Sequence, residues 1–226
     1  MRAADARPAR VSAVLFDLDG TLVDSAPDLA GTANDMLQRR GLATLPYAAL
    51  RAHAGSGARG MLGPAFGVRP GDAGYEALRD EFHDHYLTRL LQETRPFDAA
   101  LRVLDALDRC GLPWGIVTNK ALRFAVPLVQ AMGLQRSAVL VAGDSTPHTK
   151  PHPAPLQEAA RRLGHLPQTC VYVGDDARDV QAGRAAGMCT LAAAWGYLGT
   201  ELAPGAWGAD AVLPDADALL HWLELP

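Results

Sequence analysis

The sequence predicts an α/β fold in which a Rossmann-like parallel sheet has helices on both faces and an all-helical cap is inserted after the first strand. Three observations lead to this prediction. Short apolar runs alternate with segments of helical periodicity, glycines follow the last turns of several of those segments, and one long region has helical patterns without a strand. Strands that alternate with helices are typical of a parallel sheet whose two faces are both covered.

Five apolar runs predict the buried strands of this sheet. They cover residues 11–16, 113–118, 138–143, 170–174 and 189–194. The segments between them have helical spacing, as Leu101, Leu104 and Leu107 illustrate. We expect five of the helices to end at a glycine, because glycine adopts the left-handed conformation of a helix end without a steric clash. These glycines are Gly41, Gly111, Gly133, Gly164 and Gly187.

The region between about residues 25 and 95 differs from the rest of the chain. Two apolar stripes at helical spacing run through residues 29–37 and 78–90, and a glycine-rich stretch covers residues 55–60. We therefore expect a helical cap at residues 25–95 and an α/β core made of residues 1–24 and 96–226. Open α/β sheets bind ligands at the carboxyl ends of their strands, where this cap is expected to lie.

Composition excludes several classes of protein. Of the 226 residues, 49% are hydrophobic and 20% charged, which excludes a disordered chain or a coiled coil. The net charge of −4 gives no indication of a nucleic-acid or membrane partner. The apolar run before Asp17 is too short for a signal peptide, and no run approaches the length of a membrane span. We therefore expect a cytoplasmic protein, with its three cysteines reduced and buried.

The first predicted strand ends in two carboxylates, Asp17 and Asp19, that point the same way if strand geometry continues. Their mutual repulsion in a partly dry site would cost about 4 kcal/mol, so a divalent cation or a shared proton is expected beside them. An aspartate at a strand end can attack phosphorus as a nucleophile. A second carboxyl group nearby can protonate the leaving alcohol and later deprotonate a water molecule.

Four segments of the chain resemble, in order, the motifs of the haloacid dehalogenase superfamily in its phosphatase form. They are residues 17–21 (DLDGT), 116–119 (IVTN), 150–153 (KPHP) and 173–179 (VGDDARD). The resemblance covers nearly the whole chain. It implies a phosphoric monoester hydrolase that acts through an aspartyl-phosphate.

The resemblance also implies a role for each matching catalytic residue. Asp17 would be the nucleophile and Asp19 the general acid and base. Thr118, together with the backbone amide of Asn119, would bind phosphoryl oxygens. Lys150 would supply positive charge to the phosphoryl group and reduce the repulsion around Asp17.

A magnesium site is implied as well, because hard oxygen ligands suit Mg²⁺. Its ligands would be Asp17, the carbonyl group of Asp19, and Asp175, with Asp179 as a further metal group. Asp176 is a weaker candidate. An acidic residue at the position of Asp179 could instead act only on the dipole of the helix that begins there.

Substrate choice is expected to depend on residues in and near the cap. Arg59 is flanked by glycines and could bind a carboxylate or sugar oxygens. His53 and Arg123 are further candidates for the same pocket. For each of the three, a surface or packing role stays open as the alternative.

Two branches of the superfamily compete for the substrate. Residues 143–145 and 150–156 resemble bacterial phosphoglycolate phosphatases, whereas residues 55–59, 114–120 and 174–179 resemble the N-acetylmuramic acid 6-phosphate phosphatase branch. A sugar-phosphate mutase has the same core motifs and remains an alternative. A non-catalytic binding protein on this scaffold is a second alternative, although no catalytic group is missing. We expect a monomer or a homodimer whose partner is a small phosphorylated metabolite.

Overall fold

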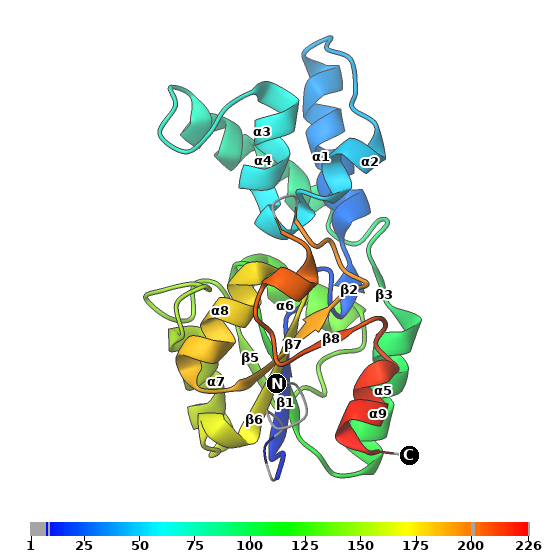
Figure 1. Ribbon diagram of the computed structural model, residues 1–226. Coiled ribbons are helices and arrows are strands. Elements are labelled where there is room, and N and C mark those ends of the chain that lie inside the picture. The colour runs from blue at the N-terminus through cyan, green and yellow to red at the C-terminus, as the bar shows by residue number, and fades with distance from the viewer. Residues whose placement is uncertain (1–7, 9, 200–201, 226) are drawn as a thin grey trace.

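The computed structural model describes residue 8, residues 10–199 and residues 202–225. Residues 1–7, 9, 200–201 and 226 of the predicted core therefore lie outside the described part. The main sheet has six parallel strands in the order β5-β4-β1-β6-β7-β8 (Figure 1). They are β1 (Ala13–Phe16), β4 (Trp114–Val117), β5 (Val139–Val141), β6 (Cys170–Gly174), β7 (Cys189–Ala193) and β8 (Ala211–Leu213).

The five predicted strands are confirmed as β1, β4, β5, β6 and β7. Strand β8 was not predicted; it has only three residues, and its Val212 is 43% exposed. Such a short segment carries little periodicity of its own. It becomes a strand by pairing with β7, in a register that sets Leu191 beside Ala211.

Helices cover both faces of the sheet, as predicted, and alternate residues of β1 contact them. Val14 and Phe16 pack in the hydrophobic cluster that contains Leu104, Leu128 and Leu219, from α5 (Asp98–Arg109), α6 (Leu122–Ala131) and α9 (Ala218–Leu223). Ala13 and Leu15 pack in a second cluster with residues of α7 (Ala154–Leu163) and α8 (Ala177–Ala186). The period of two along the strand thus divides the core into two layers.

Glycine ends the helices as the sequence predicted. All five of the predicted glycines have positive φ angles, between 65° and 81°. The prediction that every cysteine is buried was wrong at one position. Cys170 and Cys189 lie in buried strands, but Cys110 caps the carboxyl end of α5 and is exposed.

The helical insertion consists of α1 (Ala26–Arg39), α2 (Tyr47–Arg51), α3 (Gly57–Phe66) and α4 (Tyr75–Arg89). It lies beyond the carboxyl ends of the sheet strands (Figure 1). A short antiparallel pair, β2 (Val23–Asp24) and β3 (Arg95–Pro96), joins it to the core and was not predicted. In the described part of the chain, no helix has the length and apolar character that crossing a membrane requires.

Buried polar contacts hold the two connecting segments of the insertion together; we call these segments (residues 23–28 and 93–96) the neck. The fully buried carboxylate of Asp28 accepts hydrogen bonds from the backbone amides of Glu93 and Thr94 and from Thr94 Oγ1, the last at 2.7 Å. The hydroxyl of Tyr197 accepts hydrogen bonds from the backbone amides of Ser25 and Ala26. The neck is therefore anchored both to itself and to the core.

Candidate active site

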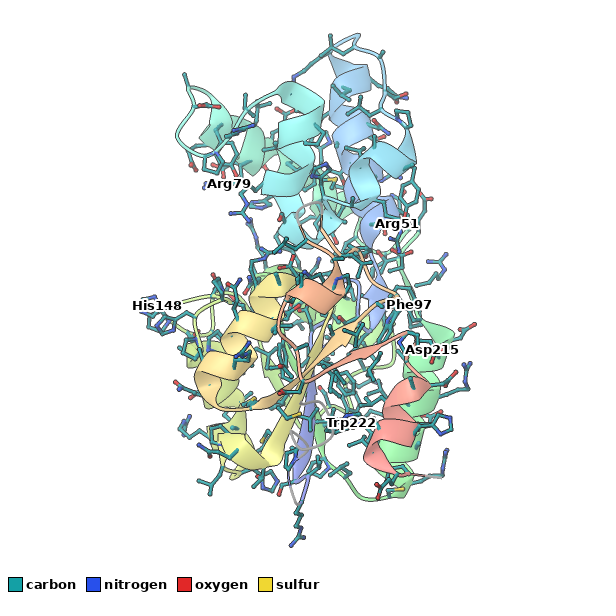
Figure 2. The ribbon with its side chains drawn as sticks, viewed as in Figure 1. Arg51, Arg79, Phe97, His148, Asp215 and Trp222 are labelled. Atoms are coloured by element: carbon teal, nitrogen blue, oxygen red, sulfur yellow. The ribbon has the colours of Figure 1, made fainter. Side chains whose placement is uncertain are left out.

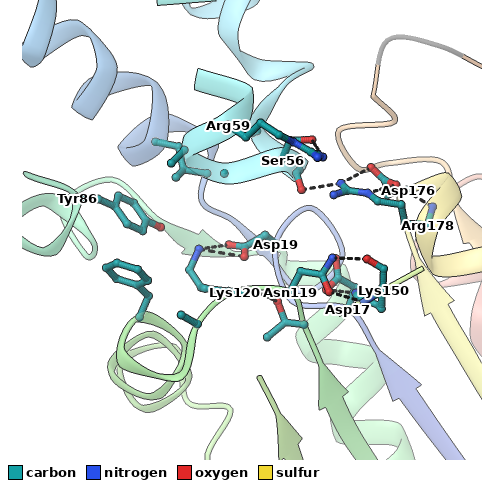
Figure 3. Close-up of a pocket in the computed structure, with 18 of the residues that line it drawn as sticks. Asp17, Asp19, Ser56, Arg59, Tyr86, Asn119, Lys120, Lys150, Asp176 and Arg178 are labelled. Carbon is teal, nitrogen blue, oxygen red and sulfur yellow. Dashed lines mark hydrogen bonds and ion pairs between the residues drawn. The ribbon is translucent and has the colours of Figure 1, made fainter. Parts of the chain in front are cut away.

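The candidate site lies where the strand order reverses. Asp17 follows β1, Thr118 follows the neighbouring strand β4, and Asp175 follows β6 on the other side of β1. Ligands bind at such a switch point because the loops of adjacent strands diverge there. A cavity of about 350 Å³ opens at this edge, between the sheet and the helical insertion (Figure 3).

Three carboxylates meet at the floor of this cavity. Asp17, Asp175 and Asp179 each offer an oxygen atom, and these atoms lie within 4.8 Å of one another. Asp175 is held by Thr21 Oγ1 at 2.9 Å and by the backbone amide of Tyr197 at 2.7 Å.

Glycine is required around Asp175. A Cβ atom at Gly20 would lie 2.2 Å from the Asp175 carboxylate, and one at Gly196 would lie 2.2 Å from Asp175 Cβ. The chain therefore leaves room for one carboxylate in a fixed position between two close backbone segments.

The three carboxylates are poorly compensated in the protein alone. Burial raises the pKa of Asp17 to about 7 against the opposing effect of Lys150, and the negative charges of Asp179 and Asp19 add to the rise. Burial, followed by the charges of Asp17 and Asp179, raises the pKa of Asp175 well above its usual range. Perturbed carboxyl groups of this kind are typical of functional sites.

Lys150 is the only cation that forms an ion pair with this cluster among the described residues. Its ammonium donates hydrogen bonds to Asp17 Oδ1 at 2.8 Å, Asp179 Oδ1 at 2.7 Å and the Tyr172 hydroxyl at 2.7 Å. Three negative charges therefore face one positive charge. The two uncompensated charges equal the charge of one divalent cation, so the donor set fits a metal site.

Asp176 and Asp179, at the start of α8, differ in their relation to the cluster. Asp176 caps α8 and forms an ion pair with Arg178 at 2.7 Å. Its carboxylate is not part of the cluster of three. Asp179 belongs to the cluster and also accepts a hydrogen bond from the backbone amide of Asp176 at the start of α8. It thus makes the helix-end contact considered in the sequence analysis and the contact with Lys150 as well.

Asp19 lies beside the cluster, with its side chain turned elsewhere. Lys120 Nζ donates to both of its carboxylate oxygens, at 2.9 and 3.0 Å, and Ser25 Oγ donates to Oδ1 at 2.5 Å. Its side chain is 14% exposed, at the wall of the cavity. The carboxyl group of Asp19 is therefore held at a fixed place beside the cluster of three, with Lys120 as its ion-pair partner.

Thr118 and Asn119 line the cavity next to Asp17. Thr118 is buried, and its Oγ1 accepts a hydrogen bond from the backbone amide of Lys120. The side-chain amide of Asn119 makes two hydrogen bonds of 2.9 Å with the backbone of Lys150. Asn119 thus fixes the loop that carries Lys150, while its backbone amide stays the predicted phosphate contact.

The three predicted substrate residues are placed differently. Arg59 lines the cavity and is exposed. The residues that line the cavity include neither His53 nor Arg123. Arg79, which was not predicted, also lines the cavity. Figure 2 shows Arg79 and Arg51 on opposite sides of the insertion.

Sequence reasoning missed several residues at the site. Lys120 and Arg178 lie inside the quoted motifs, and their positions after β4 and at the start of α8 were the available signal. Arg178 also donates to the backbone carbonyl of Gly55 in the insertion, at 2.8 Å. Tyr172 and Tyr86 gave no such signal, because each occurs in an apolar pattern that core packing explains.

The chain was compared with known proteins. A family model described as haloacid dehalogenase-like hydrolase matches residues 11–187. An N-acetylmuramic acid 6-phosphate phosphatase of Pseudomonas aeruginosa is 40% identical over 95% of this chain and 96% of its own length. A phosphoglycolate phosphatase of Xylella fastidiosa is 46% identical over 88% of this chain and 87% of its own. A crystal structure of a predicted phosphoglycolate phosphatase from Haemophilus somnus has a TM-score of 0.83 at 26% identity, and covers 94% of this chain and 98% of its own.

Proposed function

This chain belongs to the haloacid dehalogenase-like hydrolases and is a phosphatase, and from that premise we propose that it hydrolyses 2-phosphoglycolate or N-acetylmuramic acid 6-phosphate through a phosphorylated Asp17. The observation that carries the proposal is the position of the three carboxylates and Lys150 at the floor of a cavity that the insertion closes. Cytoplasmic location and a monomeric or homodimeric state stay predictions.

The first half of the reaction transfers the phosphoryl group to the protein. Asp17 Oδ attacks phosphorus, and the bond between phosphorus and the ester oxygen breaks. Asp19 donates a proton to that oxygen, so the substrate leaves as an alcohol. Lys150, Thr118 and the backbone amide of Asn119 stabilise the charge on the phosphoryl oxygens during transfer.

The second half returns Asp17 to its starting state. Asp19, now ionised, takes a proton from a water molecule that attacks the phosphorus of the aspartyl-phosphate. The bond between phosphorus and Asp17 breaks, and inorganic phosphate is released. Lys120 and Ser25 hold Asp19 in one orientation for both proton transfers, which the distances of 2.9 and 2.5 Å support.

We propose Mg²⁺ as the cofactor, held by Asp17 and Asp175, with Asp179 beside it and the backbone carbonyl of Asp19 as a further ligand. When bound, the ion would neutralise charge on Asp17 and on the phosphate. Asp175 is fixed for this task by Thr21 and the backbone amide of Tyr197.

The insertion excludes bulk water from the cavity in this proposal. Arg178 donates from the core to the carbonyl of Gly55, and Arg51 donates from the insertion to the carbonyl of Gly196, at 3.1 Å. These two contacts are of the kind that breaks and reforms when such an insertion opens for substrate.

Phosphate release tests the proposal. The purified protein with Mg²⁺ is given 2-phosphoglycolate, N-acetylmuramic acid 6-phosphate and several hexose phosphates, and kcat/KM is measured for each. We expect one of the first two to exceed the hexose phosphates by about 100-fold, which is about 2.7 kcal/mol of transition-state binding. Conversion of a sugar phosphate into its positional isomer without net phosphate release would instead indicate a mutase.

A further inference from the structure

One polar group in the cavity wall has no partner. The hydroxyl of Tyr86, on α4 of the insertion, makes no hydrogen bond with any described residue, although Tyr86 is only 2% exposed. Buried hydroxyls are almost always hydrogen-bonded, because an unsatisfied group loses its contacts with water and gains none. An exception in the wall of a candidate active site therefore indicates a group that a ligand satisfies.

The ring of Tyr86 is held so that its hydroxyl keeps one direction. It stacks on Phe82 with ring centroids 6.1 Å apart and is tilted against Phe124 of the core at 5.4 Å. Lys120 Nζ lies 5.0 Å from the centre of the Tyr86 ring. In Figure 3 the hydroxyl end of Tyr86 points towards the side where Lys120 and Asp19 meet.

The two groups at this place are both hydrogen-bond donors. Burial raises the pKa of Tyr86 to about 12 against the opposing effect of the neighbouring Lys120 ammonium, so its hydroxyl keeps its proton at neutral pH. The Lys120 ammonium has three N–H groups and is 7% exposed, with Asp19 as its hydrogen-bonded partner. A ligand atom that satisfies both groups must be an acceptor, such as an oxygen with free lone pairs.

The location of this acceptor follows from Asp19. If Asp19 protonates the ester oxygen, that oxygen lies within hydrogen-bond distance of the Asp19 carboxylate, and Lys120 Nζ lies 2.9 Å from the same carboxylate. An oxygen separated from the ester oxygen by two carbons lies about 3 Å from it when the chain is bent, as ordinary bond lengths require. It can therefore reach Lys120 and Tyr86.

We propose that the Tyr86 hydroxyl and the Lys120 ammonium bind an oxygen of the leaving group that is separated from the ester oxygen by two carbons. This inference rests on the proposed function. Both candidate substrates carry such an oxygen. In 2-phosphoglycolate it belongs to the carboxylate, and in N-acetylmuramic acid 6-phosphate it is the ring oxygen. The same pair of residues would thus select for the O–C–C–O unit.

Matched substrates and a single-atom variant test this proposal. Ethyl phosphate lacks the carboxylate of 2-phosphoglycolate, and cyclohexylmethyl phosphate lacks the ring oxygen of N-acetylmuramic acid 6-phosphate together with its other polar groups. Tyr86→Phe removes only the hydroxyl. Tyr47→Phe makes the same change at an exposed tyrosine on α2 that does not line the cavity, and serves as the control.

We expect Tyr86→Phe to lower kcat/KM at least about tenfold for either 2-phosphoglycolate or N-acetylmuramic acid 6-phosphate, because one hydrogen bond is lost. The kcat/KM for the analogue paired with that substrate should stay unchanged. The pair that responds identifies the source of the oxygen. The melting temperature of Tyr86→Phe should equal or exceed that of the wild type, because an unsatisfied group is removed. Equal losses for substrate and analogue, or no loss for either pair, would overturn the proposal.

A binding measurement separates this inference from the proposed function. The dissociation constants of 2-phosphoglycolate, N-acetylmuramic acid 6-phosphate and their analogues are measured by calorimetry on Asp17→Asn with and without Tyr86→Phe. Absence of phosphate release by the wild type would contradict the proposed function, but a tenfold weaker binding confined to one substrate would still support the Tyr86 site. Identical dissociation constants in the two variants would overturn the inference whether or not phosphate is released.

Discussion

Replacing Asp17 with asparagine is expected to stabilise the metal-free protein while it abolishes turnover. Asp17 lies in a cluster in which three carboxylates face one lysine. Asparagine keeps the shape of the side chain and removes one of the two uncompensated charges. It cannot attack phosphorus as a carboxylate does, so phosphate release should fall by several orders of magnitude.

The size of the stabilisation can be worked out from the geometry. With all three carboxylates ionised, two repulsions across at most 4.8 Å cost at least about 3.5 kcal/mol each at an effective dielectric constant of about 20, and attraction by Lys150 at 2.8 Å returns about 6 kcal/mol. The remaining penalty is at least about 1 kcal/mol. The rise in the pKa of Asp17 from 3.8 to about 7 includes the cost of burial and sets an upper bound of about 4 kcal/mol.

The pH dependence gives the sign of the effect. Because the folded-state pKa is raised, the folded protein binds a proton between pH 3.8 and about 7 that the unfolded chain has lost. Stability therefore falls as pH rises through this window, and the penalty is complete above pH 7. We expect the gain from Asp17→Asn to be largest at pH 8 and to fall below half of that value at pH 5.

Thermal unfolding in the presence of a chelator measures this prediction. A chain of this size gains about 2–4 °C in melting temperature per kcal/mol, so a rise of several degrees is expected at pH 8. Asp176→Asn is the matched control, because Asp176 is paired with Arg178 and caps α8, and its loss should lower the melting temperature. If Asp17→Asn were less stable than the wild type at pH 8 without metal, the claim that the cluster has two uncompensated negative charges would be refuted.

Three further changes test other parts of the structure. Lys150→Met removes the only cation paired with the cluster among the described residues and should lower the free energy of unfolding of the metal-free protein by about 3–5 kcal/mol. Mg²⁺ should restore the melting temperature but not turnover, and an unchanged melting temperature of the metal-free variant would contradict this prediction. Asp28→Asn weakens the hydrogen bonds of the neck and should lower the free energy of unfolding by about 1–3 kcal/mol. Hydrogen exchange at residues 93–96 should then be faster, and unchanged protection of these amides would count against the role of Asp28. Arg178→Gln loses the contact with the Gly55 carbonyl, so steady-state kinetics should give a KM raised by about tenfold with a smaller change in kcat; the reverse pattern would argue against a closing contact.

Much of the core could be predicted because local patterns and tertiary contacts agree there. Strand β1 is apolar on both faces because helices cover both, and its buried run is therefore continuous in the sequence. Strand β8 and the pair β2–β3 could not be predicted in this way. Each has two or three residues and exists through pairing with a partner that is distant in the sequence.

The candidate site likewise contains residues that could be predicted from the sequence and residues that could not. The resemblance assigned roles to Asp17, Thr118, Lys150 and Asp175 because each lies in a segment that resembles a motif of the family. Nothing local distinguishes Tyr86 from a core tyrosine, since its helix has an apolar stripe at that position. Only the folded chain reveals that its hydroxyl lacks a partner and that its ring lies beside Lys120.

The central claim is that Asp17 carries the phosphoryl group during the reaction. Wild-type protein with Mg²⁺ and its preferred substrate is quenched with acid within milliseconds, digested, and analysed by mass spectrometry. We expect a phosphoryl group on the peptide that contains Asp17, at a level that falls as substrate is exhausted. Rapid phosphate release with an unmodified Asp17 peptide at every time point would contradict the account.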